Sequence, residues 1–137
     1  MEVNVGWGFM KNIPISDEIR RFILSNIPSV PHLEALLLMR SEHEHQWSIS
    51  ELAKRLFINE QVTQAIVEDL QTAGVVKKVG KKPSLYQYYT SYDELKKLVD
   101  NLAITYSSSL IEVTNLIHSN MDHKAVKFAN AFMWRKK

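Results

Sequence analysis

The chain has 137 residues, of which 45% are hydrophobic, and it contains no cysteine. This composition supports a packed core in one domain or two small ones, and it excludes disulfides, thiolate catalysis and cysteine-ligated metals. The formal net charge is only +2, but the charge is uneven: residues 49–90 hold six basic and four acidic side chains, and residues 121–137 hold five and one. No apolar run reaches the length of a membrane span and the N-terminus is unlike a secretory signal, so we expect a cytoplasmic protein without membrane contact.

Residues 1–15 show no periodicity and are expected to form an N-terminal arm. Apolar residues at helical spacing then predict a helix from Ser16 to Pro28 and a second one from Ser29 to about Arg40. The polar stretch 41–47 is expected to be a loop. Its Glu42-His43-Glu44-His45 sequence could bind a metal, but a solvated loop without metal is the better interpretation, and no cofactor is expected.

The next segment predicts two short helices. Ser48 and Glu51 have the spacing of a capping box, in which the Ser48 hydroxyl and the Glu51 carboxylate each accept from the other residue's backbone N–H. Asn59 is a good N-cap for a following helix that ends at Gly74. The expected inward face of that helix consists of Val62, Thr63, Ile66, Leu70 and Ala73. Two strands, 75–79 and 85–89, are expected to follow, joined by the turn GKKPS.

A second capping box, Ser91 to Glu94, is expected to open a long helix that reaches about residue 119, with a weak point at Ser107–Ser109. One apolar stripe runs along this helix, through Leu95, Leu98, Leu102, Tyr106, Leu110, Val113 and Ile117. Because a stripe of this length exceeds what a small domain can cover, we expect it to pair with a second copy of the chain. The alternative is that the helix folds back onto its own domain.

The stretch ISELAKRLFINEQVTQAIVEDLQTAGVVKK resembles the winged helix-turn-helix of bacterial MarR and PadR regulators. Its expected order is two short helices, the second of which ends at a glycine, followed by a hairpin. The stretches 27–40, 113–119 and 128–137 extend the resemblance to a family of small, uncharacterised bacterial winged-helix proteins. The resemblance implies a mostly α fold with a small β-hairpin, divided into an arm (1–15), a winged helix-turn-helix domain (16–90) and a C-terminal helical dimerisation region (91–137).

The resemblance further implies a homodimeric transcriptional regulator that binds double-stranded DNA, and not an enzyme. In such a protein the helix after Asn59 would enter the major groove. The amides of Asn59, Gln61 and Gln64 would pair with bases, and the hairpin lysines Lys77, Lys78, Lys81 and Lys82 would contact phosphates. The same helix carries Glu60, Glu68 and Asp69 and no basic residue. The alternative is therefore a winged helix that binds a protein partner and whose lysines only solvate a strand edge.

Overall fold

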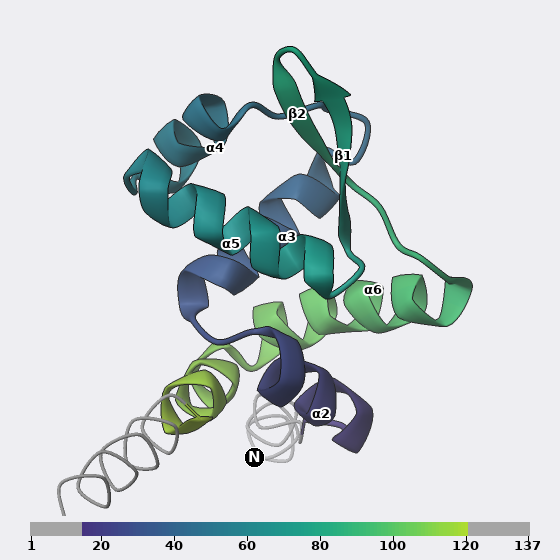
Figure 1. The fold of residues 1–137 in the computed structure, drawn as a ribbon. Helices are drawn as coiled ribbons and strands as arrows, with labels where there is room; N and C mark the ends of the chain where they lie inside the picture. Colours follow the sequence, from purple (N-terminus) through teal and green to yellow (C-terminus); the bar gives the residue numbers. More distant parts are fainter. Residues whose placement is uncertain (1–14, 121–137) are drawn as a thin grey trace, which may run out of the picture. The chain divides into compact units, whose positions relative to one another are not determined.

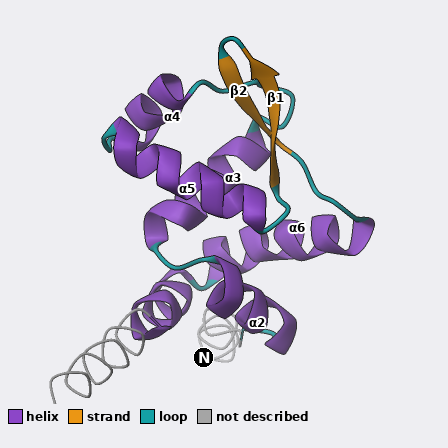
Figure 2. Cartoon of the chain, in the orientation of Figure 1, coloured by secondary structure: helices purple, strands orange, loops and turns teal. Residues whose placement is uncertain are grey.

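The structure, a computed structural model, describes residues 15–120, which are mostly helical with one small β-hairpin (Figures 1 and 2). This confirms the predicted fold class at the level of a mostly α protein with a two-stranded antiparallel hairpin. The helices are α2 (Asp17–Asn26), α3 (Val30–Ser41), α4 (Ile49–Leu56), α5 (Glu60–Thr72) and α6 (Asp93–Ser108), the strands are β1 (Val76–Lys81) and β2 (Ser84–Tyr88), and residues 110–120 are also helical. Within residues 15–120 no single helix is long and apolar enough to cross a membrane; only α2 and α3 taken together pass that test, with a break between them. Residues 1–14 of the predicted arm (1–15) and residues 121–137 lie outside the described part.

The described chain divides into two compact units. One unit is formed by residues 30–100, and the other by the described residues of 1–29 and 101–137. The candidate site lies in the unit 30–100, where α5 packs against α3, α4 and β1, and β2 packs against α3 and α4. The core of this unit is apolar and almost fully buried; its members include Leu33, Leu36, Met39, Trp47, Leu52, Ile66, Val67, Leu70, Val76 and Tyr86.

The hairpin is joined to the helical core by a backbone bridge. The Trp47 N–H donates to the Tyr86 carbonyl (2.7 Å) and the Tyr86 N–H donates to the Trp47 carbonyl (2.8 Å). Both side chains are buried, and the bridge is a single antiparallel pair outside the two-stranded sheet. The hairpin is therefore anchored through β2, while Lys77, Lys78 and Lys81 of β1 and Lys82 at the turn remain exposed.

The predicted helix boundaries are confirmed at three positions. Ser48 accepts from the Glu51 N–H (3.1 Å) and Asn59 accepts from the Val62 N–H (2.8 Å), so both are N-caps. Gly74 follows α5 with φ +82°. A Cβ at Gly74 would meet the Ser91 hydroxyl at 2.7 Å, so both the backbone angle and the space require glycine.

Other details of the sequence prediction were wrong. The Glu51 carboxylate does not complete a capping box, because it faces His45 Nε2 at 2.9 Å. Ser91 does not cap α6; its hydroxyl donates to the Gly74 carbonyl (3.3 Å) and the helix begins at Asp93. On α5 the inward face includes Val67 but not Val62, which is 45% exposed because it lies in the first turn, before the helix reaches the core.

Candidate nucleic-acid interface

The first turn of α5 is exposed at all its leading positions, namely Asn59, Glu60, Gln61 and Val62. The position of the turn is fixed by the Asn59 cap and by Thr63, whose buried hydroxyl donates to the Asn59 carbonyl (2.9 Å). Buried Ile66, Val67 and Leu70 hold the rest of the helix against the core. The turn therefore presents Asn59, Glu60 and Gln61 at the end of a helix that is packed against the core.

The three side-chain amides predicted to contact bases differ in the hydrogen bonds that they already make within the chain. The Asn59 oxygen already accepts from Val62, and the Gln64 amide nitrogen donates to a Glu68 carboxylate oxygen (2.9 Å). Bidentate pairing with adenine uses both ends of an amide. Each of these hydrogen bonds leaves one lone pair or one N–H at that end but orients the amide toward the chain, so pairing would require the side chain to turn. Within residues 15–120, Gln61 makes no side-chain hydrogen bond and is exposed. Gln61 is therefore the amide best placed for pairing with a base.

Two of the three acidic side chains of α5 form hydrogen bonds with other side chains of the same unit. Asp69 Oδ2 lies 2.8 Å from Nε2 of His32, a mostly buried histidine of α3, and Glu68 accepts from Gln64. Sequence analysis did not predict the His32–Asp69 pair, since their side chains are brought together only by the packing of α3 against α5. Glu60 remains in the first turn, where the positive end of the helix dipole stabilises a carboxylate.

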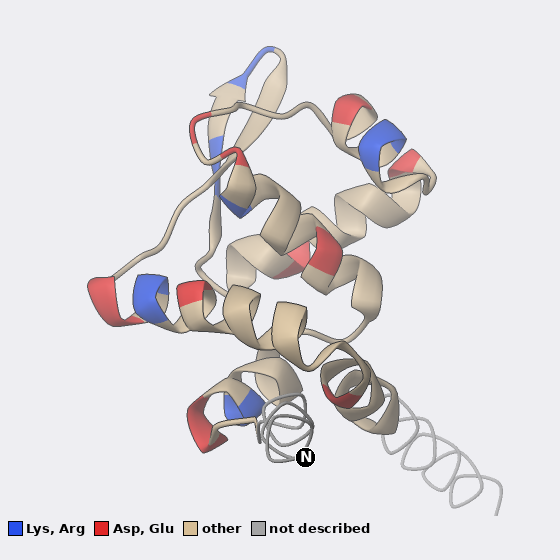
Figure 3. Ribbon diagram, turned by 180° about the vertical axis from the view of Figure 1, so that it is seen from behind, with Lys and Arg blue, Asp and Glu red and all other residues tan. Residues whose placement is uncertain are grey.

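The four hairpin lysines are exposed (Figure 3 shows the lysines and arginines of residues 15–120 in blue). Lys77 pairs with Gln87 and Lys78 with Tyr86 in the antiparallel register, and the ladder is irregular between Lys78 and Gly80. The Lys77 ammonium lies 5.0 Å from the centre of the Tyr89 ring, a cation–π contact that leaves its charge at the surface. The Lys82–Pro83 peptide is cis and forms the turn between the strands. None of the four lysines has a carboxylate partner among the described residues.

Two further residues at the turn between α4 and α5 were missed by the sequence analysis. Phe57 is 93% exposed and has φ +58°, and Lys54 is exposed without an ion-pair partner within residues 15–120. Its neighbour Arg55 is engaged: it donates to Glu42 (2.9 Å) and lies 5.3 Å from the Trp47 ring. The sequence analysis assigned no position to Phe57, because an apolar residue at the end of a short helix fits a core and a surface equally well.

The residues predicted for dimerisation are mostly covered within one chain. Leu95, Leu102, Val113 and Ile117 are buried, Leu98 and Tyr106 are half-buried, and Leu110 is 53% exposed. The stripe is therefore not open at these four positions, which are covered within the single chain, and the helical run is interrupted at Ser109. Among the described residues of the unit that contains residues 101–120, the large apolar side chains that are exposed are Ile104 (65%), Leu110, Ile111 (68%) and Leu24 (36%).

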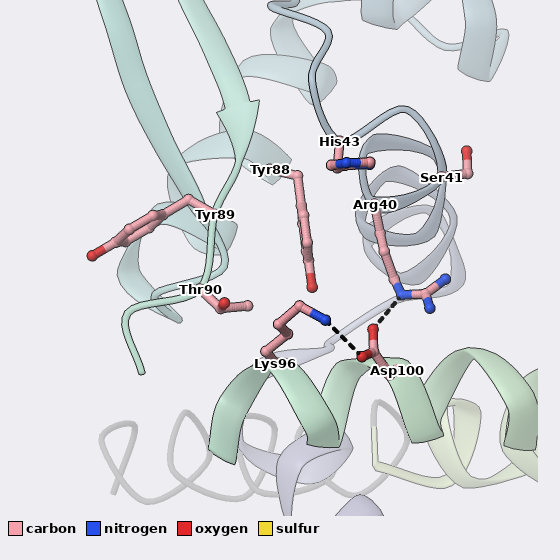
Figure 4. Close-up of a pocket in the computed structure, with 8 residues that line it drawn as sticks. All are labelled: Arg40, Ser41, His43, Tyr88, Tyr89, Thr90, Lys96 and Asp100. Atoms are coloured by element: carbon pink, nitrogen blue, oxygen red, sulfur yellow. Dashed lines mark hydrogen bonds and ion pairs between the residues drawn. The ribbon is translucent and has the colours of Figure 1, made fainter. Parts of the chain in front are cut away.

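A separate cavity of about 490 Å³ lies in the unit 30–100, between the end of α3, the end of β2 and the start of α6 (Figure 4). Arg40 Nε donates to Asp100 Oδ1 (2.9 Å) and Lys96 Nζ donates to Asp100 Oδ2 (3.1 Å). The Tyr88 hydroxyl is buried in its wall and makes no hydrogen bond with the described residues. Burial, with a smaller contribution from Asp100, raises the pKa of Tyr88, so the phenol stays protonated at neutral pH.

The pKa of Asp100 is lowered, whereas that of Tyr88 is raised. Burial, the largest single effect, raises the pKa of Asp100, but the hydrogen bonds and charges of Arg40 and Lys96 together outweigh burial. The pKa of Asp100 therefore lies below its usual 3.8. The three side chains form an ion network that ties α3 to α6.

Comparisons of the chain with protein-family models, with curated proteins and with solved structures give no match.

Proposed function

We propose that this chain is a winged helix-turn-helix protein that binds double-stranded DNA as a homodimer. In this proposal α4 and α5 form the helix-turn-helix, the first turn of α5 enters the major groove, and β1 and β2 form the wing. The observation that supports it best is the exposure of this first turn, with the uncommitted amide of Gln61. The same compact unit holds four exposed lysines that have no carboxylate partner among residues 15–120. Asn59 would then position the helix, and Lys77, Lys78, Lys81 and Lys82 would contact phosphates.

The electrostatics of the hairpin give a measurable expectation. Each phosphate neutralised contributes about −0.9 to the slope of log affinity against log salt, so four lysines give roughly −3.6 for each protomer. Fluorescence anisotropy with a random-sequence duplex at roughly 50 mM and 200 mM salt measures this slope. We expect Lys81→Glu to weaken binding and to make the slope shallower. Lys97→Glu is the matched control, because Lys97 is an exposed lysine of α6 outside the hairpin and the charge change is identical.

The homodimer is supported by the exposed apolar side chains Ile104, Leu110 and Ile111. Leu110 and Ile111 are adjacent in the sequence, and contiguous exposed apolar side chains often mark interaction surfaces. Dimeric regulators of this type bind two half-sites. We expect light scattering to give the mass of a dimer for the unmodified chain. A monomer mass at tens of micromolar protein would remove dimerisation from the proposal and leave DNA binding to the single chain.

The second candidate is a winged helix that binds a protein. It is favoured by the composition of α5, which has Glu60, Glu68 and Asp69 and no basic residue. The anisotropy experiment separates the two candidates, because a protein-binding module would show no duplex binding at low salt even at micromolar concentration.

A further inference from the structure

Phe57 has a conformation that is unfavourable for its residue type. It is the C-cap of α4, with φ 58° and ψ 41°, and its backbone N–H bonds to the Ala53 and Lys54 carbonyls. This left-handed position favours glycine and strains a side chain with a Cβ. The ring gains little from packing in return, because it is 93% exposed. A strained, exposed aromatic residue in a rigid turn indicates a role in contacting something outside the chain.

The surroundings of Phe57 connect it with the candidate interface. Phe57 lines one hollow of about 610 Å³ together with Lys54 of α4 and with Asn59 and Glu60 at the start of α5. The ring is therefore continuous with the first turn of α5. Lys54 supplies a positive charge at the same hollow, which suits a phosphate backbone beside the contacted base.

We propose that Phe57 contacts thymine methyl groups in the major groove, and that the interface therefore selects A·T base pairs. This inference rests on the proposed DNA binding. An apolar side chain is suited to the thymine methyl group, and the Gln61 amide is suited to the N6 and N7 atoms of adenine. Guanine is contacted most often by arginine or lysine, and α5 has neither. Phe57 thus favours thymine and Gln61 favours adenine, so both residues favour A·T base pairs.

The test removes only the methyl group. A duplex enriched by the protein from a random pool is prepared with thymine and again with uracil, which keeps every hydrogen-bonding atom. We expect the enriched sequence to be rich in A·T pairs, and the uracil duplex to bind about fourfold more weakly for each methyl group contacted, the effect of burying one such group. The control variant is Phe57→Asn, because asparagine tolerates the left-handed conformation. We expect this variant to bind the thymine duplex more weakly than the unmodified protein and to bind both duplexes equally.

Several results would overturn the inference. Equal binding of the thymine and uracil duplexes by the unmodified protein would do so, as would a uracil effect that persists in Phe57→Asn or an enriched sequence dominated by G·C pairs. These outcomes leave salt-dependent DNA binding intact, so they reject the thymine contact without rejecting the proposed function. Absence of binding to any duplex would reject both. Circular dichroism of Phe57→Asn confirms that the variant is folded before its affinity is interpreted.

Discussion

Replacing Phe57 with glycine should make the protein more stable, which is unusual for the loss of an aromatic side chain. The left-handed conformation costs a residue with a Cβ about 1–2 kcal/mol, and glycine avoids that cost. Glycine loses more backbone freedom on folding, which offsets roughly 0.5–1 kcal/mol of the gain. Because Phe57 is 93% exposed, its removal sacrifices almost no burial. The expected net change in the free energy of unfolding is therefore a gain of about 0.5–1 kcal/mol.

Urea unfolding followed by circular dichroism measures this change, and the melting temperature should rise by about 2–4 °C. Phe22→Ala is the matched control, because Phe22 in α2 is only 7% exposed. We expect the control to lose about 3–5 kcal/mol. A loss of more than about 1 kcal/mol in Phe57→Gly would show that the ring packs against the protein, and would refute both the strain and the exposure assigned to it.

The remaining predictions concern the core, the ion network and the dimer. Leu70→Ala should destabilise the chain by about 2–5 kcal/mol in urea unfolding, because Leu70 on α5 is fully buried; a change below about 0.5 kcal/mol would contradict the packing of that helix. Asp100→Asn should lower stability near neutral pH, and its deficit should shrink as the pH falls below about 4. The folded pKa of Asp100 is depressed, so its contribution is present above its unfolded pKa of 3.8 and is lost as the pH falls through the lower folded value. Urea unfolding of both proteins across that range measures the deficit, and a deficit independent of pH would exclude the ion network. Ile111→Glu should convert a dimer to a monomer in light scattering, whereas the same change at exposed Gln61 should leave the mass unaltered.

Local chemistry made parts of the fold predictable from the sequence. Asn59 and Ser48 have the side chains that accept from a helix N-terminus, and Gly74 has the backbone freedom that the end of α5 requires. The hairpin was also predicted, although its strands run from Val76 to Lys81 and from Ser84 to Tyr88 with a tighter turn than expected. These features depend on residues close together in the chain.

The errors arose where a side chain bonds to a group outside the local motif that the sequence suggested. Glu51 faces His45 instead of the Ser48 N–H, and Ser91 donates to Gly74. Periodicity predicted an apolar stripe through Leu102 and Val113 but could not show that these side chains are buried in the chain itself. It also gave no sign that Phe57 is exposed, because an aromatic residue has the same pattern in a core and on a contact surface.

The interface itself can be located by nuclear magnetic resonance of the ¹⁵N-labelled chain, titrated with duplex DNA at low salt. The account predicts that the largest shifts fall on the backbone of Phe57 to Gln61, on the Gln61 side-chain amide and on the hairpin residues Lys77 to Lys82. It also predicts little change at Ile104 and Ile111 in the other unit. Shifts that avoid both the first turn of α5 and the hairpin, or a spectrum unchanged by DNA, would contradict the central claim that this turn and these lysines form a nucleic-acid interface.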